Sequence, residues 1–236
     1  MQKQAVVSRA EWLAARKAHL VKEKELSRAR DALAEERRTL PWVKVDKTYV
    51  FDGPNGQETL SDLFGRNSQL IVYHFMFQED WKAGCPACSF LSDHVDGANL
   101  HLAHHDVSVV AASRAPRALF EPYKRRMTWR FKWVSSHAND FNQDFQVTAT
   151  PAQKAAGTMI YNYAEMPTKG GENPGLSVFY KDEAGDIFHT YSSYGRGLDL
   201  LVGAYNWLEL TPKGRNEQKN MDWMKRHDEY GKMAAE

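Results

Sequence analysis

The sequence has 236 residues and a net charge of +1, with 42% hydrophobic and 26% charged side chains. This composition is typical of a globular chain of one or two domains, and the balanced charge gives no electrostatic reason to bind nucleic acid or an anionic membrane surface. No apolar run approaches the roughly 20 residues that a membrane span needs, and the start of the chain has no secretory signal, so we expect a cytoplasmic protein.

The first predicted element is a long helix over residues 8–38. Ser8 and Glu11 have the spacing of a capping box at its start, and Pro41 ends the segment. Leucines recur about every seven residues, at Leu13, Leu20, Leu26 and Leu33. They give the helix one narrow apolar stripe. The stripe is compatible with a helix that packs on its own domain and with an arm that embraces a second subunit in a homodimer.

Strands and helices are predicted to alternate through the middle of the chain. Residues 42–60 indicate a strand, a turn and a return strand. Apolar runs rich in β-formers predict further strands over residues 69–77, 106–113 and 131–136. Helices are predicted between them, one reaching about Leu102 and one in which Pro122 should break or kink the helix. The short connections between these strands imply a parallel arrangement.

The second half of the chain is expected to be antiparallel. Residues 148–173 are polar, glycine-rich and poorly periodic, and are expected to form an excursion. A hairpin about a turn at residues 182–185 and a closing helix over residues 195–210 follow. The charged tail contains a predicted amphipathic helical patch. We therefore expect a helical arm, an α/β domain and a helical tail, over residues 1–40, 41–210 and 211–236.

Both cysteines of the chain, Cys85 and Cys88, stand two residues apart between a predicted strand and a predicted helix. The first turn of a helix has free N–H groups and the positive end of the helix dipole, so the pKa of a thiol there falls below about 8.5. Pro86 suits this position because its missing N–H costs nothing there. Cys88 lies one turn further along, where it can attack a mixed disulfide at Cys85. The pattern predicts a nucleophile at Cys85 and a resolving residue at Cys88.

Two other roles for the cysteine pair stay open. A protein zinc site usually has four ligands, and four histidines follow the pair: His94, His101, His104 and His105. Cys85 would lie far along the helix from most of them. The cysteines could also be plain packing residues. Position and spacing together favour redox chemistry, and we expect neither a metal nor a cofactor.

A resemblance to the thioredoxin-like superfamily rests on "FMFQEDWKAGCPACSFLSDHVDG", "VAASRAP", "FKWVSSHANDFNQDF", "GLSVFYKDEAGDIFHTYSSYGRGLDLL" and "WMKRHDEY". Within it, the chain resembles an uncharacterised bacterial branch labelled predicted dithiol–disulfide oxidoreductases. The resemblance implies a thioredoxin-like α/β fold with a central mixed sheet flanked by helices, a long N-terminal helix and a helical C-terminal tail. It also implies that Cys85 is the nucleophile and Cys88 the resolving residue.

The chain departs from thioredoxins near the cysteines. Thioredoxins carry a tryptophan directly before the first cysteine, whereas Gly84 stands there in this chain and Trp81 lies further upstream. Thioredoxins also place a cis-proline against the disulfide, and Pro174, ahead of "GLSVFY", is the residue expected in that role. The intervening residues tune the redox potential over a wide range, so the direction of electron flow is not determined.

The segment "FMFQEDWKAGCP" also resembles the peroxiredoxin box F-Y-P-x-D-F-T-x-x-C-P, which implies a peroxiredoxin-type elaboration of the fold. Gln78 replaces the proline of that box and Lys82 its threonine. The activating arginine expected before "GLSVFY" is replaced by Pro174 and its two neighbours. Arg114 and Lys82 could stabilise the thiolate or polarise a peroxide, but each could also be a surface residue.

The sequence thus predicts an enzyme, a thiol–disulfide oxidoreductase. It would act on a disulfide-bearing or otherwise oxidised substrate, and a cellular thiol reductant would reset the pair. The alternative enzyme is a peroxiredoxin-like thiol peroxidase. The non-enzymatic alternative is a thioredoxin-like binding or metallochaperone module that holds a soft metal through its thiolates.

Overall fold

The structure is a computed structural model that describes residues 4–231. The outermost residues of the predicted arm and tail, 1–3 and 232–236, lie outside the described residues. The chain forms two compact units, one up to Pro41 and one from Trp42 onward. Within the described range, no helix is both long enough and apolar enough to cross a membrane.

The first unit is built on the helix α1 (Arg9–Arg38), which confirms the predicted long helix. Ser8 Oγ accepts a hydrogen bond from Glu11 N at 3.3 Å, and Glu11 Oε2 accepts one from Ser8 N at 2.9 Å. This reciprocal pair is the predicted capping box. No residue of α1 is buried. Whether its leucine stripe serves its own domain or a second subunit stays a prediction.

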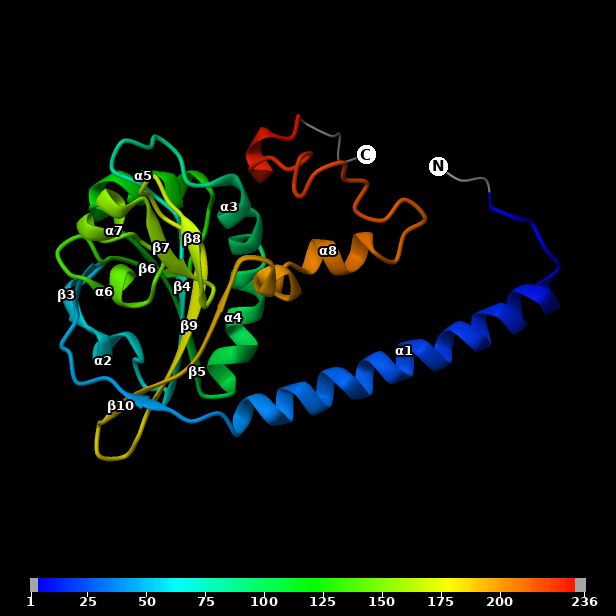
Figure 1. Cartoon of the computed structure of the whole chain (residues 1–236), viewed down its shortest axis with the longest axis horizontal. Coiled ribbons are helices and arrows are strands. Elements are labelled where there is room, and N and C mark those ends of the chain that lie inside the picture. The colour runs from blue at the N-terminus through cyan, green and yellow to red at the C-terminus, as the bar shows by residue number, and fades with distance from the viewer. Residues whose placement is uncertain (1–3, 232–236) are drawn as a thin grey trace. The chain divides into compact units, whose positions relative to one another are not determined.

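The second unit is built on an eight-stranded mixed sheet with the strand order β1-β10-β9-β4-β5-β6-β2-β3 (Figure 1). Its strands are β1 (Val43–Lys44), β2 (Val50–Gly53), β3 (Gly56–Thr59), β4 (Gln69–His74), β5 (Val107–Ser113), β6 (Lys132–Ser135), β9 (Gly175–Lys181) and β10 (Ile187–Tyr194). The strand β4 pairs parallel with β5 and antiparallel with β9, and β9 pairs antiparallel with β10. The arrangement β10-β9-β4-β5 is that of the thioredoxin-like fold, which confirms the predicted fold class.

Helices cover both faces of this sheet. They are α2 (Leu60–Leu63), α3 (Pro86–Ser92), α4 (Val95–His104), α5 (Arg117–Arg126), α6 (Phe141–Asp144), α7 (Pro151–Ala156), η1 (Gly195–Leu201), α8 (Gly203–Leu208) and η2 (His227–Glu229). One apolar core joins α3, α5 and α8 to Phe75 and Trp133, and the other joins α2 and α6 to Val72 and Phe179. The ends of β4 and β5 that carry the site are therefore packed from both sides.

The single helix predicted after the cysteines is wrong, because the structure has two helices there, α3 and α4. The break lies at Asp93 and His94. His94 Nδ1 lies 2.8 Å from the carbonyl oxygen of Phe90, and His94 Nε2 accepts a hydrogen bond from Ala204 N at 3.0 Å. The histidine thus ties the break to α8, and this long-range contact leaves no periodic signal in the local sequence.

Of the break or kink predicted at Pro122, the break does not occur. The helix α5 continues through it to Arg126. The missing N–H removes only the bond to the carbonyl four residues earlier, at Ala118 in the first turns of the helix. Phe120 and Tyr123 on either side are buried in the core. Packing of these aromatic side chains compensates for the lost bond.

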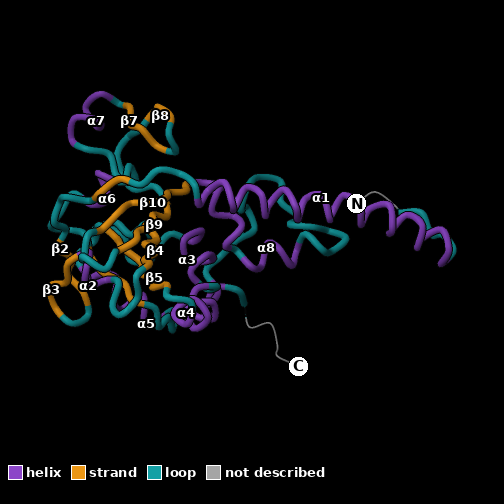
Figure 2. Tube along the Cα trace, turned by 90° about the horizontal axis from the view of Figure 1, so that it is seen from below, coloured by secondary structure: helices purple, strands orange, loops and turns teal. Residues whose placement is uncertain are grey.

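The excursion over residues 148–173 is more regular than its polar sequence indicates. It contains α7 and a separate hairpin of β7 (Thr158–Tyr161) and β8 (Ala164–Pro167), which Figure 2 shows apart from the central strands. Thr150 and Gln153 form a capping box at the start of α7, and Gly157 ends it in the left-handed conformation. The helix and its caps are visible in the sequence only as this short local motif.

The end of the chain is less helical than predicted. The closing helix is split into η1 and α8 at Val202, and the described part of the tail holds the 3₁₀ turn η2 in place of an amphipathic helix. Polar tail residues bond to backbone within the tail: Asp222 Oδ2 accepts hydrogen bonds from Gln218 N and Lys219 N. Such local bonds compete with helix formation.

Candidate active site

Cys85 lies at the start of α3, after the loop that leaves β4. It is the N-cap residue, and Pro86 occupies the first helical position, as predicted. Gly84 is needed just before it, because a Cβ there would lie 2.6 Å from the Phe75 ring and 2.7 Å from the Tyr123 ring. The carbonyl of Cys85 accepts hydrogen bonds from Ser89 N at 2.9 Å and Ser89 Oγ at 2.7 Å. These contacts fix the direction in which Cys85 enters the helix.

The geometry around Cys85 favours its thiolate. A hydrogen bond from the Cys88 side chain lowers the pKa of Cys85 to about 6, helped by the backbone N–H groups of Cys88 and Ala87, while burial acts in the opposite direction. These N–H groups are unpaired donors of the first helical turn. The positive charge of Arg226 lowers the pKa further. Cys85 therefore carries negative charge near neutral pH.

Cys88 has the opposite character. It is fully buried, and burial, together with its bond to the Cys85 thiolate, raises the pKa of Cys88 well above its ordinary value. Met76 N lies 3.5 Å from Cys88 Sγ as a backbone donor. The Tyr73 hydroxyl also bonds to the Cys88 side chain and lowers the pKa of Cys88 in part. The proton shared by the two cysteines therefore stays on Cys88. Neither cysteine is in a disulfide.

Arg226 is a site residue that the sequence interpretation missed. Its Nε and Nη2 donate to the carbonyl oxygen of Gly84 at 3.0 and 2.7 Å, and its Nη1 donates to Glu229 Oε1 at 2.8 Å. The guanidinium thus bonds to the residue directly before Cys85. The segment "WMKRHDEY" was part of the family resemblance, but nothing in its spacing indicated a contact 142 residues away.

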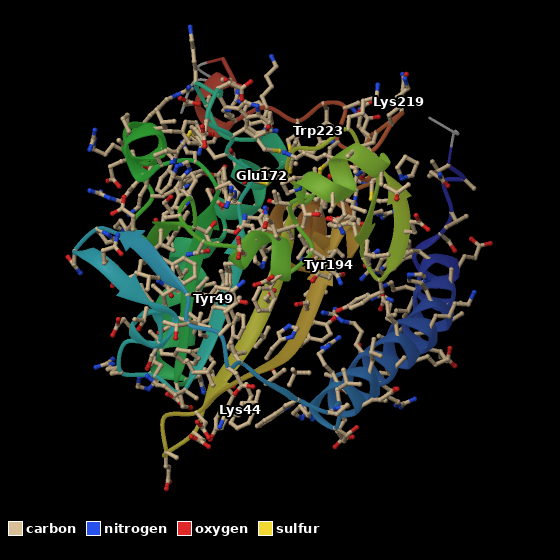
Figure 3. The ribbon with its side chains drawn as sticks, turned by 60° about the vertical axis from the view of Figure 1, so that its left-hand side comes forward. Lys44, Tyr49, Glu172, Tyr194, Lys219 and Trp223 are labelled. Atoms are coloured by element: carbon tan, nitrogen blue, oxygen red, sulfur yellow. The ribbon has the colours of Figure 1, made fainter. Side chains whose placement is uncertain are left out.

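The tail that carries Arg226 is anchored on both sides of it. His227 Nδ1 lies 2.7 Å from Asp93 Oδ1 at the end of α3, and Arg126 bonds to Asp228 at 2.6 and 3.0 Å. Trp223, labelled in Figure 3, belongs to this tail. Its ring packs edge-on against Phe90 of α3, with ring centroids 5.6 Å apart. The tail therefore lies along the helix that carries both cysteines.

The other residues predicted for the site are Trp81, Lys82, Arg114 and Pro174. Trp81 packs partly buried against the core beside α3, and Lys82 is exposed. The Arg114 guanidinium donates to the carbonyl oxygens of Ser136 and Asn139 at 3.3 and 2.8 Å. Among the described residues, no hydrogen bond joins Cys85 to Lys82 or Arg114. The functional role predicted for each stays a prediction.

Pro174 is not the cis-proline that the thioredoxin comparison implied, because no peptide bond among the described residues is cis. Tyr161 Oη donates to the Pro174 carbonyl at 2.7 Å and accepts from Gly195 N at 3.0 Å, which fixes the backbone before β9. Pro174 still lies beside the dithiol. It lines a largely apolar pocket of about 170 Å³ together with Cys88 and Tyr73.

The histidines considered as metal ligands do not gather around the cysteines. Both ring nitrogens of His94 have partners, in Phe90 and Ala204. In residues 4–231, no group of three or more His, Cys, Asp or Glu side chains is placed to hold a metal ion. The arrangement found is a thiolate at a helix start, a buried thiol beside it and a nearby guanidinium.

The sequence matches the model of one protein family over residues 1–230, a family described as a bacterial protein of unknown function, DUF899. The chain belongs to the DUF899 family. The match covers both compact units, and the tail that places Arg226 beside Gly84 lies within it. No curated protein matches this DUF899 chain.

Solved structures similar to the DUF899 chain include peroxiredoxins. Peroxiredoxin Q of Xanthomonas campestris is 12% identical over 71% of this chain and 96% of its own, with a TM-score of 0.45. The peroxidoxin BcpB of Mycobacterium tuberculosis is 12% identical over 70% and 94%, with a TM-score of 0.41. AhpC of Enterococcus faecalis is 12% identical over 72% and 93%, with a TM-score of 0.44. No residue role is transferred from these proteins.

Proposed function

We propose that this DUF899 protein is a thiol–disulfide oxidoreductase, with Cys85 as its nucleophile and Cys88 as its resolving residue. The observation that carries the proposal is the position of the two cysteines: Cys85 stands at the start of α3, and Cys88 is fully buried one turn further along. This arrangement lowers the pKa of Cys85 and raises that of Cys88, so the Cys85 thiolate is the favoured nucleophile. Thiolates, and not thiols, attack disulfides.

The reaction balances as a two-electron exchange. The Cys85 thiolate attacks one sulfur of the substrate disulfide, which forms a mixed disulfide and releases the first substrate thiolate. Cys88 then gives up its proton to water and attacks the Cys85 sulfur, which forms the Cys85–Cys88 disulfide and releases the second substrate thiolate, which water protonates. The substrate has been reduced and the pair oxidised. A thiol reductant, of the kind that the cytoplasm supplies, returns the pair to its dithiol form.

Turnover of a model disulfide tests the proposal. Purified protein should catalyse the reduction of bis(2-hydroxyethyl) disulfide by dithiothreitol, and Cys85→Ser should abolish the catalysed rate. Full activity in Cys85→Ser would refute the proposal. Rapid hydrogen peroxide consumption with a sulfenic acid at Cys85, and no disulfide turnover, would instead establish the thiol peroxidase alternative.

A thiol peroxidase finds less support in this site than a disulfide reductase. Reduction of a peroxide calls for donors that polarise the O–O bond beside the thiolate. Arg114 uses its guanidinium on two backbone carbonyls, and Lys82 is exposed. Arg226, whose positive charge lowers the pKa of Cys85, donates its hydrogen bonds to the Gly84 carbonyl and to Glu229.

A further inference from the structure

Glu172 is a buried carboxyl group that takes no part in the exchange described above. It lies in the loop between β8 and β9 (Figure 3). The residue is 8% exposed. Oε2 accepts a hydrogen bond from Phe77 N at 2.7 Å, and Oε1 accepts one from Arg114 N at 3.1 Å. Phe77 follows β4 and Arg114 follows β5. One carboxyl group thus joins the carboxyl ends of two parallel strands, the edge where sites of open α/β sheets form.

The residue before Phe77 contacts both cysteines. Met76 N lies 3.5 Å from Cys88 Sγ, and the Met76 carbonyl accepts a hydrogen bond from Cys85 N at 3.3 Å. The Met76 and Phe77 peptides are consecutive, so a shift of Phe77 N moves the groups that hold the dithiol. Hydrogen bonds therefore connect the Glu172 carboxyl, through the backbone of Phe77 and Met76, to Cys88 Sγ and to the backbone N of Cys85.

Glu172 can exchange protons with water. A pocket of about 520 Å³ opens beside it. The charged side chains that line this pocket with Glu172 are Glu79, Asp80, Arg114 and Lys154. Burial raises the pKa of Glu172 to about 7, against the lowering effect of its two N–H donors and of the Arg114 charge. The carboxyl therefore changes its protonation state close to neutral pH.

We propose that Glu172 is a positioning residue of the dithiol site, which holds the Met76–Phe77 backbone against both cysteines and loosens it on taking up a proton from water. Ionised Glu172 makes two charge-assisted hydrogen bonds, and protonation removes the charge that strengthens them. The consequence for catalysis rests on the proposed function. The coupling itself concerns the protonation of Cys85 and is measurable without turnover.

Amide chemical shifts test the first link directly. In full-length protein with Cys85→Ser and Cys88→Ser, no thiol titrates, so the Phe77 and Arg114 amides should report Glu172 alone. They should titrate together with a common midpoint near pH 7, and Met76 should follow with a smaller shift. Addition of Glu172→Gln should abolish the common step. Absence of the step in the parent protein, or its persistence in Glu172→Gln, overturns the proposal.

The pKa of Cys85 tests the second link. Glu172→Gln places an NH₂ group against a backbone donor and so loosens Met76, which contacts Cys88, the main hydrogen-bond donor to Cys85. With native cysteines it should therefore raise the pKa of Cys85. The matched control is Glu58→Gln, which removes another largely buried carboxylate, bound to Lys132 at 2.6 Å on the edge strand β3. It should leave the pKa of Cys85 unchanged. An unchanged pKa in Glu172→Gln, or an equal rise in both variants, overturns the proposal. If Glu172→Gln fails to fold, the amide titration of the parent decides.

Failure of the proposed function gives a different result. If the protein shows no disulfide turnover but shows the common amide step and the shifted pKa of Cys85, the oxidoreductase proposal fails. Glu172 is then still a positioning residue, of a dithiol with another chemistry. If the protein shows disulfide turnover but neither of these two signatures, the oxidoreductase proposal stands and the proposed role of Glu172 fails.

Discussion

At the scale of single residues, the two cysteines are differentiated by one hydrogen bond and by unequal burial. The bond from Cys88 is the largest influence on the pKa of Cys85, and burial is the largest influence on the pKa of Cys88. The N–H groups at the start of α3 and the charge of Arg226 add to the effect on Cys85. The helix start alone would lower the pKa of a thiol. In this site, however, the hydrogen bond from Cys88 lowers the pKa of Cys85 the most.

Removal of that donor should therefore raise the pKa of Cys85 from about 6 toward the ordinary thiol value. We expect this for Cys88→Ala, measured by titration of the thiolate absorbance in the ultraviolet. Cys88→Ser keeps a hydroxyl donor and should give an intermediate value. A pKa that stays near 6 in Cys88→Ala would show that the helix start and Arg226 suffice without Cys88.

Replacement of Arg226 should raise the pKa of Cys85 by less than Cys88→Ala does, because its charge is the smallest of the identified influences. Alkylation of Cys85 by iodoacetamide at about pH 6 should then be slower in Arg226→Gln, because less of the thiol is ionised. Arg125→Gln is the matched control, since Arg125 is 68% exposed and stands in α5 directly before Arg126, which bonds to the tail. Equal alkylation rates in both variants would exclude a specific effect of Arg226.

At the scale of elements, the turn into α3 is fixed by a close approach that only glycine allows. Gly84→Ala would force a Cβ against the rings of Phe75 and Tyr123. We expect it to lower the free energy of unfolding by about 1–3 kcal/mol. Gly97→Ala in α4 is the control, because no atom lies within 4 Å of the added Cβ and alanine is the better helix former. Chemical denaturation of both variants checks this, and an equal stability would contradict the packing described for Gly84.

Several elements of the chain were predictable because their signals are local. The apolar run of β4, the proline at the start of α3 and the capping box of α1 identify those elements from the sequence alone. The break at His94 and the splitting of the closing helix were not predictable, since the His94 contact with Ala204 spans 110 residues.

The same distinction separates the predicted from the unpredicted site residues. Cys85 and Cys88 are identifiable because strand, cysteine pair and helix follow each other within one short stretch. Arg226 and Glu172 lie in polar segments without periodicity, and their partners at Gly84 and Phe77 are backbone groups. Backbone partners leave no pattern in the sequence, so only the folded chain brings these residues to the dithiol.

At the scale of the whole molecule, the thioredoxin-like sheet brings segments from the middle and the end of the chain to one edge. The strands β4 and β5 end there, the β8–β9 loop supplies Glu172, and the tail supplies Arg226. The pH dependence of stability should report on this assembly. Burial at this edge raises the pKa of Glu172 above its value in the unfolded chain, which makes stability depend on pH.

Glu172 should make the folded chain more stable at acidic pH than at alkaline pH. Its pKa is raised from 4.5 to about 7 on folding, so its contribution to stability is fully present below pH 4.5 and is lost as the pH rises through about 7. Relative to Glu172→Gln, the native chain should lose about 3 kcal/mol of unfolding free energy between the two ends of this window. Urea denaturation at both ends measures the difference. A difference that is constant with pH would contradict the raised pKa.

The most direct test of the account is the identity of the sulfur that attacks. Cys88→Ala, Cys85→Ala and the native chain are each treated with bis(2-hydroxyethyl) disulfide, and their products are read by mass spectrometry of peptides. We expect a stable mixed disulfide at Cys85 in Cys88→Ala, a Cys85–Cys88 disulfide in the native chain and no adduct in Cys85→Ala. An adduct at Cys88 that forms as fast in Cys85→Ala as the Cys85 adduct forms in Cys88→Ala would contradict the account.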